Sequence, residues 1–159
     1  MIPPFKADHV GSFLRPERLQ TARAQFAEGK LAAEELRGIE DDCIREVVKR
    51  QEDVGLKGIT DGEFRRTFFH VDFLEKLDGV DVTYGEFKTH FRKDDGSEVG
   101  FAPPTMHVNE TIAHSQSIQG ADFDFLKSVV TQTPKVSIPA PSMLHFRGGR
   151  DAISASVYP

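Results

Sequence analysis

The clearest pattern of apolar and polar positions lies between Leu31 and Val54. Apolar residues recur there every three or four positions, and charged residues fill the positions between them. This spacing predicts one amphipathic helix that packs on one side. Its apolar face consists of Leu36, Ile39, Cys43, Ile44, Val47, Val48 and Val54. We interpret Cys43 as a small buried apolar residue rather than a nucleophile, because its surroundings on this face are not electropositive.

Shorter segments before and after this helix predict an alternation of strands and helices. We expect strands at 4–13, 56–60 and 135–138, and helices at 17–28, 71–77 and 121–131. Pro16 suits the first position of the helix 17–28, and Gly29 suits its C-cap. Strands that alternate with helices are typical of a parallel α/β unit.

Residues 80–104 follow a different pattern, in which apolar and polar residues alternate. Val82 and Tyr84 alternate in one phase, whereas Phe87, Thr89 and Phe91 alternate in the opposite phase. The change of phase predicts a bulge at Gly85. Asp95-Gly96 is a typical turn, and Pro103-Pro104 closes the segment. The segment 80–104 therefore predicts a β-hairpin inserted between α/β elements.

Composition and charge narrow the class of protein. The chain has 159 residues, of which 38% are hydrophobic, so we expect residues 1–159 to form a single domain with one core. Its net charge is −5 and no basic stripe is present, which predicts no nucleic-acid partner. No apolar run approaches the ~20 residues of a membrane span, and residues 1–10 carry no apolar signal core. We therefore expect a cytoplasmic protein that does not contact a membrane.

Polar residues follow three of the expected strands, where parallel α/β sheets and barrels bind their ligands. They are His9-Val10-Gly11-Ser12, Asp61-Gly62-Glu63 and Pro141-Ser142. Ser12 can bind a carboxylate or phosphate through its hydroxyl and N–H groups, and Glu63 can bind an ammonium group. The alternatives are a turn or helix cap for Ser12, and an ion pair with Arg65 or Arg66 for Glu63.

Further candidates come from the histidines and from one basic loop. His9 is either a ligand or base, or a hydrogen-bonded structural residue. The loop 145–150 contains Arg147 beside two glycines, which suits an anion, although a solvated loop has the same composition. The other histidines lack the spacing of metal ligands. A single cysteine excludes an intrachain disulfide and cannot by itself build a thiolate metal site.

Four stretches of the sequence are much more specific as an ordered set than any one alone. They read HVGSFLRP, QEDVGLKGITDGEFRR, DFLEKLDGV and VSIPAPSMLHFRGGR. Together they resemble the cobalamin-independent methionine synthase family, and most closely its short, single-barrel MetE-like relatives. The resemblance spans nearly the whole chain. It implies a (β/α)₈ barrel in which zinc activates homocysteine as a thiolate and a methylated folate donates the methyl group.

The resemblance also implies roles for individual residues. Val10-Gly11-Ser12 is similar to the family's IGS segment, which contacts the amino-acid substrate. Glu63 is similar to the family's glutamate that holds the substrate ammonium group. The family's zinc ligands, a His, two Cys and a Glu, come from later strands of the barrel and are expected beyond residue 159. The family also has a tryptophan near the folate, and this chain has none, with Phe146 or Arg147 nearest to that position.

Chain length sets the expected extent of the fold. A (β/α)₈ barrel needs about 250 residues. We therefore expect an α/β fold that is the N-terminal portion of a TIM-type barrel, with about three barrel strands and the inserted hairpin. The rest of the barrel would come from a missing C-terminal half, from another chain or from self-association. We expect this chain alone to be inactive.

Three functions stay open at this point. The first is methyl transfer to a small thiol amino acid, homocysteine. The second is zinc-dependent alkyl transfer between other thiols. The third is a non-catalytic truncated fragment.

Overall fold

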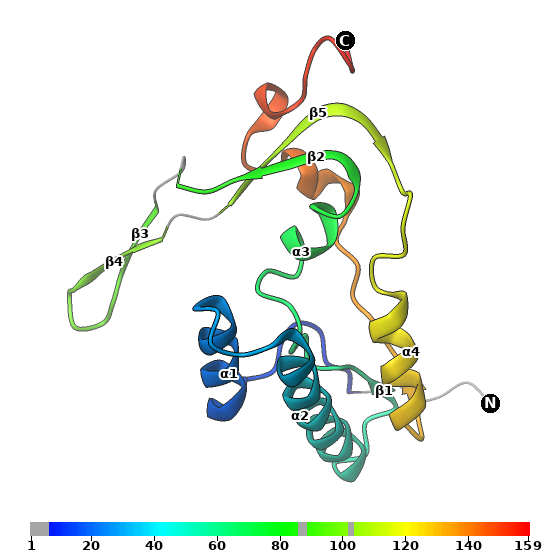
Figure 1. Ribbon diagram of the computed structural model, residues 1–159. Coiled ribbons are helices and arrows are strands. Elements are labelled where there is room, and N and C mark those ends of the chain that lie inside the picture. The colour runs from blue at the N-terminus through cyan, green and yellow to red at the C-terminus, as the bar shows by residue number, and fades with distance from the viewer. Residues whose placement is uncertain (1–6, 86–88, 102–103) are drawn as a thin grey trace. The chain divides into compact units, whose positions relative to one another are not determined.

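The computed structural model describes residues 7–85, 89–101 and 104–159, and the chain divides into two compact units (Figure 1). Unit 1 comprises residues 1–67 and 119–137, and unit 2 comprises residues 68–118 and 138–159. Each unit is thus built from two separate stretches of sequence. The expected single domain over residues 1–159 stays a prediction. No helix in the described part of the chain is long and apolar enough to cross a bilayer.

Unit 1 is built around its longest helix, as the sequence predicts. It contains α1 (Glu17–Ala27), α2 (Ala33–Asp53), β1 (Gly58–Ile59), α4 (Gly120–Val129) and β6 (Thr133–Pro134). The apolar face of α2 buries Cys43, Ile44, Val47 and Val48 against Leu19 of α1 and against Ile59 and Phe64. Burial of each large apolar side chain contributes roughly 1.5–3 kcal/mol. This core fixes the position of β1 and of the residues that follow it.

Residues next to the helix termini of unit 1 cap α1 and α2. The Glu35 carboxylate accepts a hydrogen bond from the Ala32 N–H group at 3.1 Å and caps the start of α2. Gly55 ends α2 with a φ of +88°, and Gly29 follows α1 with a φ of +70°. Pro16 is the N-cap residue of α1 rather than its first helical residue.

A short parallel pair of strands, β1 and β6, lies in unit 1. Gly58 pairs with Thr133 and Ile59 with Pro134, so the strand expected at 135–138 is wrong, since β6 ends at Pro134. The Thr133 and Lys135 N–H groups donate to the carbonyl oxygens of Lys57 and Ile59 at 3.1 and 2.8 Å, so these two residues face β6. Thr60 faces the opposite edge, where both of its backbone groups bond to the Gln51 side-chain amide, at 3.0 and 2.8 Å. This edge is therefore not free to pair with a further strand.

The first expected strand is also wrong where the structure describes it. Residues 7–13 form no strand, and residues 4–6 lie outside the described residues. Lys135 holds this segment instead, through an ion pair with Asp8 and a hydrogen bond to the carbonyl oxygen of His9. The ion pair and hydrogen bond with Lys135 hold the pKa of the Asp8 carboxyl group below its ordinary value.

Unit 2 consists mainly of antiparallel strands. It contains α3 (Val71–Leu74), β2 (Asp78–Thr83), β3 (Thr89–Arg92), β4 (Glu98–Phe101), β5 (Thr105–Ala113) and two 3-10 helices, η1 (Pro141–His145) and η2 (Gly149–Ala152). β2 pairs with β5, and β3 pairs with β4. The antiparallel pairing therefore extends beyond the expected limits of 80–104, since it starts at Asp78 and ends at Ala113.

Two local expectations for unit 2 can be compared with the structure in part. A register irregularity lies between Asp78 and Val80, whereas the bulge expected at Gly85 adjoins residues outside the described ranges and stays a prediction. It surrounds Gly79, whose φ is +79° and where a Cβ atom would lie 2.8 Å from the Glu110 carbonyl oxygen. The helix expected at 71–77 ends at Leu74, because the next residues form tighter turns before β2 begins. Residues 86–88 and 102–103 of the expected hairpin lie outside the described residues.

Candidate functional site

The chain makes a buried turn directly after β1, at residues 60–66, which we call the 60–66 turn. Two consecutive residues in it have left-handed backbone conformations, Gly62 with a φ of +70° and Glu63 with a φ of +56°. Among the described residues, Glu63 is the only residue other than glycine with a positive φ. This conformation costs a residue with a side chain about 1–2 kcal/mol. Such strain persists only where the surrounding structure over-determines it, and it clusters at functional sites.

Three short-range hydrogen bonds shape the 60–66 turn. The Glu63 N–H group donates to Asp61 Oδ1 at 2.9 Å, and the Gly62 N–H group donates to Thr60 Oγ1 at 3.1 Å. The Arg66 N–H group donates to the Glu63 carbonyl oxygen at 3.1 Å. The sequence singles out Asp61 as a candidate site residue. Its carboxylate supports the backbone of Glu63, and its role in the site stays a prediction.

Residues 9–15, which we call the 9–15 segment, lie against this turn. The Phe13 N–H group donates to the Gly62 carbonyl oxygen at 3.1 Å. The Arg15 guanidinium donates to the carbonyl oxygen of Glu63 at 3.1 Å and to that of Arg66. The structure thus brings the segment that carries Ser12 onto the turn that carries Glu63. Ser12 is exposed and directly precedes Phe13, whose N–H group bonds to Gly62.

The remaining residues of the 9–15 segment have structural contacts. His9 Nε2 donates to the Gly11 carbonyl oxygen at 2.8 Å, and its ring stacks on Phe13 with the centroids 3.7 Å apart. These contacts favour the structural alternative for His9 over a ligand or base. Gly11 has a φ of +93°, which glycine adopts at little cost, and Val10 is exposed.

The Glu63 carboxylate is buried, with only 9% of its side chain exposed. Arg65 is not its partner, because Arg65 bonds to Glu40 and Asp41. Within the described residues its one ion pair is with Arg66, where Oε1 lies 3.9 Å from Nη1. A buried carboxylate with so distant a cation keeps the capacity to accept hydrogen bonds from a bound ammonium group.

Arg66 is held by contacts other than Glu63. Its Nη1 donates to the Ser137 carbonyl oxygen at 3.0 Å. With the Gln119 amide oriented to place its oxygen towards Arg66, that oxygen accepts from Nη2 at 2.7 Å and from Nε at 3.2 Å. Arg66 therefore joins the 60–66 turn to residues near α4 and β6.

The candidates from the second half of the sequence belong to unit 2. Ser142 lies exposed in η1, and Arg147 donates to the Pro104 carbonyl oxygen at 2.8 Å. Burial, followed by the charge of Arg147, lowers the pKa of His70 in the same unit. An association of Ser142 or Arg147 with Ser12 and Glu63 stays a prediction.

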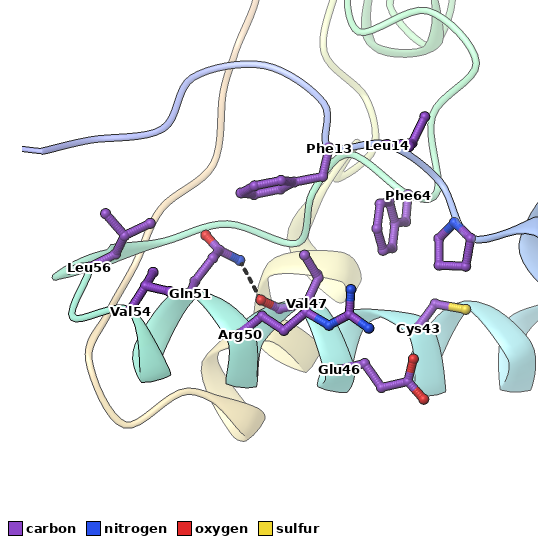
Figure 2. Close-up of a pocket in the computed structure, with 11 residues that line it drawn as sticks. Phe13, Leu14, Cys43, Glu46, Val47, Arg50, Gln51, Val54, Leu56 and Phe64 are labelled. Atoms are coloured by element: carbon purple, nitrogen blue, oxygen red, sulfur yellow. Dashed lines mark hydrogen bonds between the residues drawn. The ribbon is translucent and has the colours of Figure 1, made fainter.

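One apolar cavity of unit 1 is lined by neither Ser12 nor Glu63. Figure 2 shows this cavity, of about 370 Å³, between α2 and residues Phe13, Leu14 and Phe64. Its other lining residues are Pro16, Cys43, Glu46, Val47, Arg50, Gln51, Val54 and Leu56. Burial raises the pKa of the Cys43 thiol, which disfavours the reactive thiolate. The interpretation of Cys43 as a buried apolar residue is confirmed.

The zinc implied by the sequence resemblance does not fit the residues described. No group of three or more His, Cys, Asp or Glu side chains in the described ranges could hold a metal ion. Cys43, the chain's single cysteine, is buried in the core of unit 1. Thiolate ligands for zinc are therefore absent from this part of the chain.

Comparison with known families identifies the chain. The model of the family described as "Cobalamin-independent synthase, Catalytic domain" matches residues 5–90, which is more than half of the chain. The chain belongs to this family. Both the 9–15 segment and the 60–66 turn lie within residues 5–90, which the model of this synthase family matches.

Similarity to individual proteins supports the assignment of the chain to this synthase family. The chain is 44% identical to the protein YxjG of Bacillus subtilis over 92% of its own length and 38% of that protein. It is 30% identical to a 5-methyltetrahydropteroyltriglutamate–homocysteine methyltransferase of Thermotoga maritima, over 88% of its length and 18% of that enzyme. The chain thus spans less than two fifths of these curated relatives.

Two solved structures show the same fold relationship. A putative vitamin-B12-independent methionine synthase from Listeria monocytogenes superposes with a TM-score of 0.72 and 40% identity, over 92% of this chain and 40% of that one. A B12-independent methionine synthase from Shewanella gives a TM-score of 0.54 and 25% identity, over 77% of this chain and 36% of that one. The α/β fold of this family member therefore resembles that of methionine synthase structures.

Sequence reasoning missed some residues that build the site. Arg15 stands beside Pro16 and gave no signal beyond a turn before α1. Gln119 lies more than fifty residues from Arg66, and no local pattern links the two. A glutamate that directly follows a glycine in a turn was the available sign that Glu63 adopts an unusual backbone conformation.

Proposed function

We propose that the 9–15 segment and the 60–66 turn bind the α-amino acid group of homocysteine, in an enzyme that transfers a methyl group to the homocysteine thiol. The observation that carries this proposal is the hydrogen bond from Phe13 to Gly62. It brings Ser12 against a turn whose buried glutamate is held in a strained conformation. Family membership supports the same chemistry.

Each end of the amino acid has a suited group in this site. The Glu63 carboxylate accepts hydrogen bonds from the substrate ammonium group, and charge-assisted bonds of this kind are stronger than neutral ones. Ser12 donates to the substrate carboxylate through its hydroxyl and N–H groups. The Shewanella relative is described in complex with selenomethionine, which has the same α-amino acid group. Recognition at this end leaves the sulfur end of the substrate for the methyl transfer.

The methyl donor and the rest of the enzyme are part of the proposal. The name of the Thermotoga relatives supports a methylated folate as donor. The zinc that would lower the thiol pKa does not fit the described residues, so we propose that its ligands come from outside this chain. We propose that a longer protein, another chain or a second copy completes the barrel, since the relatives are more than twice as long.

A binding experiment with one carboxylate removed tests the proposal. Calorimetry would measure the affinity of the 159-residue chain for L-homocysteine and L-methionine, before and after Glu63→Gln. Loss of a hydrogen bond to a charged group costs about 1.5–3 kcal/mol, which is roughly a 10- to 150-fold weaker affinity. Glu34→Gln, at an exposed position on α2, is the matched control and should bind like the unchanged chain.

Two outcomes would contradict the proposal. One is an unchanged affinity of the Glu63→Gln variant for both amino acids. The other is no binding of either amino acid by the unchanged chain at millimolar concentrations.

A further inference from the structure

Arg15 contacts the main chain of the 60–66 turn at two residues, Glu63 and Arg66. Its Nη2 donates to the Glu63 carbonyl oxygen at 3.1 Å and to the Arg66 carbonyl oxygen. We propose that Arg15 is a positioning residue, which fixes the direction of the Glu63 carboxylate by holding the Glu63 backbone in its left-handed conformation. This inference rests on the proposed function, because it gives Glu63 a substrate to recognise.

The hydrogen bonds around Glu63 explain how its backbone is held. The Glu63 N–H group is fixed by Asp61, as described above, and the Glu63 carbonyl oxygen accepts from both Arg15 and the Arg66 N–H group. Because the peptide groups on both sides of Glu63 are fixed, its φ and ψ angles are fixed as well. The direction of the Cα–Cβ bond follows from these angles. Without Arg15, the Glu63 carbonyl oxygen would lose one of two donors, and the disfavoured conformation would lose support.

The type of side chain matters for this role. A guanidinium group presents several N–H donors in a rigid planar fork, and it stays charged at all pH values that proteins tolerate. It can therefore bond to two carbonyl oxygens at once. A lysine ammonium is a compact charge on a flexible stem and holds such a geometry less firmly.

The position of Arg15 links the two halves of the proposed site. Arg15 lies three residues after Ser12, and Phe13 between them bonds to Gly62. The segment proposed to bind the substrate carboxylate is thus the segment that holds the ammonium-binding glutamate in place. A loss of Arg15 should therefore act on recognition of the ammonium group, although Arg15 does not touch the substrate.

A comparison of two ligands separates positioning from general structural support. L-Methionine has the ammonium group that Glu63 would bind, and 4-(methylthio)butyrate lacks it. Calorimetry would measure both affinities for the unchanged chain, Arg15→Ala and Arg15→Lys. We expect Arg15→Ala to bind L-methionine roughly tenfold more weakly and 4-(methylthio)butyrate with unchanged affinity. Arg15→Lys should fall between Arg15→Ala and the unchanged chain for L-methionine.

Controls keep the two proposals separable. Arg18→Ala removes another arginine near the same segment, one that pairs with Glu46 at 2.9 Å on the surface, and it should change neither affinity. In a Glu63→Gln background, Arg15→Lys should cause no further loss for L-methionine. Circular dichroism checks that each variant folds. If Arg15→Ala does not fold, Arg15→Lys provides the test, through weaker binding of L-methionine and unchanged binding of 4-(methylthio)butyrate.

Defined results would overturn the positioning role. An equal loss for both ligands would mean that Arg15 only supports the structure. If Glu63→Gln weakens L-methionine binding and the Arg15 variants do not, the positioning role fails and the proposed function stands. If Glu63→Gln itself leaves the affinity unchanged, the proposed function fails, and the positioning role fails with it.

Discussion

Two turns of this chain share one kind of side-chain hydrogen bond, from a backbone N–H group to an aspartate. They differ in the other hydrogen bonds that support them. In the 60–66 turn, Asp61 accepts a hydrogen bond at 2.9 Å from the N–H group two residues later. In residues 93–97, which we call the 93–97 turn, Asp95 accepts the same kind of bond at 2.8 Å from Ser97. In the 93–97 turn, Gly96 has a positive φ, at +83°. In the 60–66 turn, both Gly62 and the next residue, Glu63, have a positive φ.

The bonds that support each turn explain this difference. The 93–97 turn is exposed, and within the described residues its backbone–backbone bonds join Lys93, Gly96 and Ser97. The 60–66 turn is buried and also bonds to Phe13 and Arg15, about fifty residues away in the sequence. A glycine needs no such support in a left-handed conformation, but a glutamate does. The comparison teaches that tertiary bonds in unit 1 maintain a strained, buried carboxylate, and this supports the proposed binding site.

The largest expected effect comes from adding a methyl group to the glycine of each turn. A Cβ atom at Gly62 would lie 3.0 and 3.2 Å from atoms of the Phe64 ring, whereas nothing lies within 4 Å of a Cβ atom at Gly96. Gly62→Ala should therefore cost the backbone penalty plus overpacking, about 2–4 kcal/mol in total. Gly96→Ala should cost only the backbone penalty, about 1 kcal/mol.

Urea unfolding of the two variants measures this difference. Circular dichroism of the helices in unit 1 is a suitable signal, since Phe64, which a Cβ atom at Gly62 would meet, packs in the core with α2. Equal destabilisation by Gly62→Ala and Gly96→Ala would break the comparison, because it would mean that the packing around the 60–66 turn adds nothing.

A smaller effect is expected from removing the strain at Glu63 itself. Glu63→Gly and Glu63→Ala both delete the carboxylate, but only glycine adopts a φ of +56° freely. Glu63→Gly should therefore be more stable than Glu63→Ala by about 1 kcal/mol. Both variants should lose recognition of the L-methionine ammonium group. Unfolding free energies measure the first effect and calorimetry measures the second, and a less stable glycine variant would argue against strain at this position.

The smallest expected effect is a pH dependence of the 93–97 turn. Hydrogen bonds from the Ser97 hydroxyl and N–H groups hold the pKa of Asp95 below its ordinary value of 3.8. A carboxyl pKa that is lower in the folded chain means that the bond stabilises the turn above about pH 4. This stabilisation is lost as the pH falls through the folded pKa.

An NMR titration of the Ser97 amide signal from pH 6 to pH 2 would follow this loss. The midpoint should lie below 3.8, and Asp95→Asn should remove the transition. A midpoint at or above 3.8 would show that Ser97 does not stabilise the charged form of Asp95.

The sequence was most informative where one element carries its own pattern. The helical period of the apolar residues in α2 predicts both its extent and the burial of Cys43, because a helix buries whatever lies on its apolar face. The sequence also points to Ser12 and Glu63, first by their places after expected strands and then by family resemblance. The structure adds the contact between their segments, and their roles stay proposals.

The sequence was least informative where groups from other parts of the chain bond to backbone atoms. The Gln51 side chain bonds to both backbone groups of Thr60, on the edge that faces away from β6, and no local pattern predicts this. The same holds for Arg15, whose two acceptors lie about fifty residues later. Contacts of this kind depend on the assembled unit, so they become visible only in the structure.

The most direct test of the account is a titration of the isotope-labelled chain with L-homocysteine, followed by NMR. We expect the amide signals of Ser12, Phe13, Gly62 and Glu63 to shift in a saturable way, and those of Gly96 and Ser97 to stay unchanged. Glu63→Gln should weaken the response at the 60–66 turn. Signals that shift elsewhere while those of Ser12 and Glu63 stay unchanged, or no saturable shift at all, would contradict the assignment of an amino-acid-binding site.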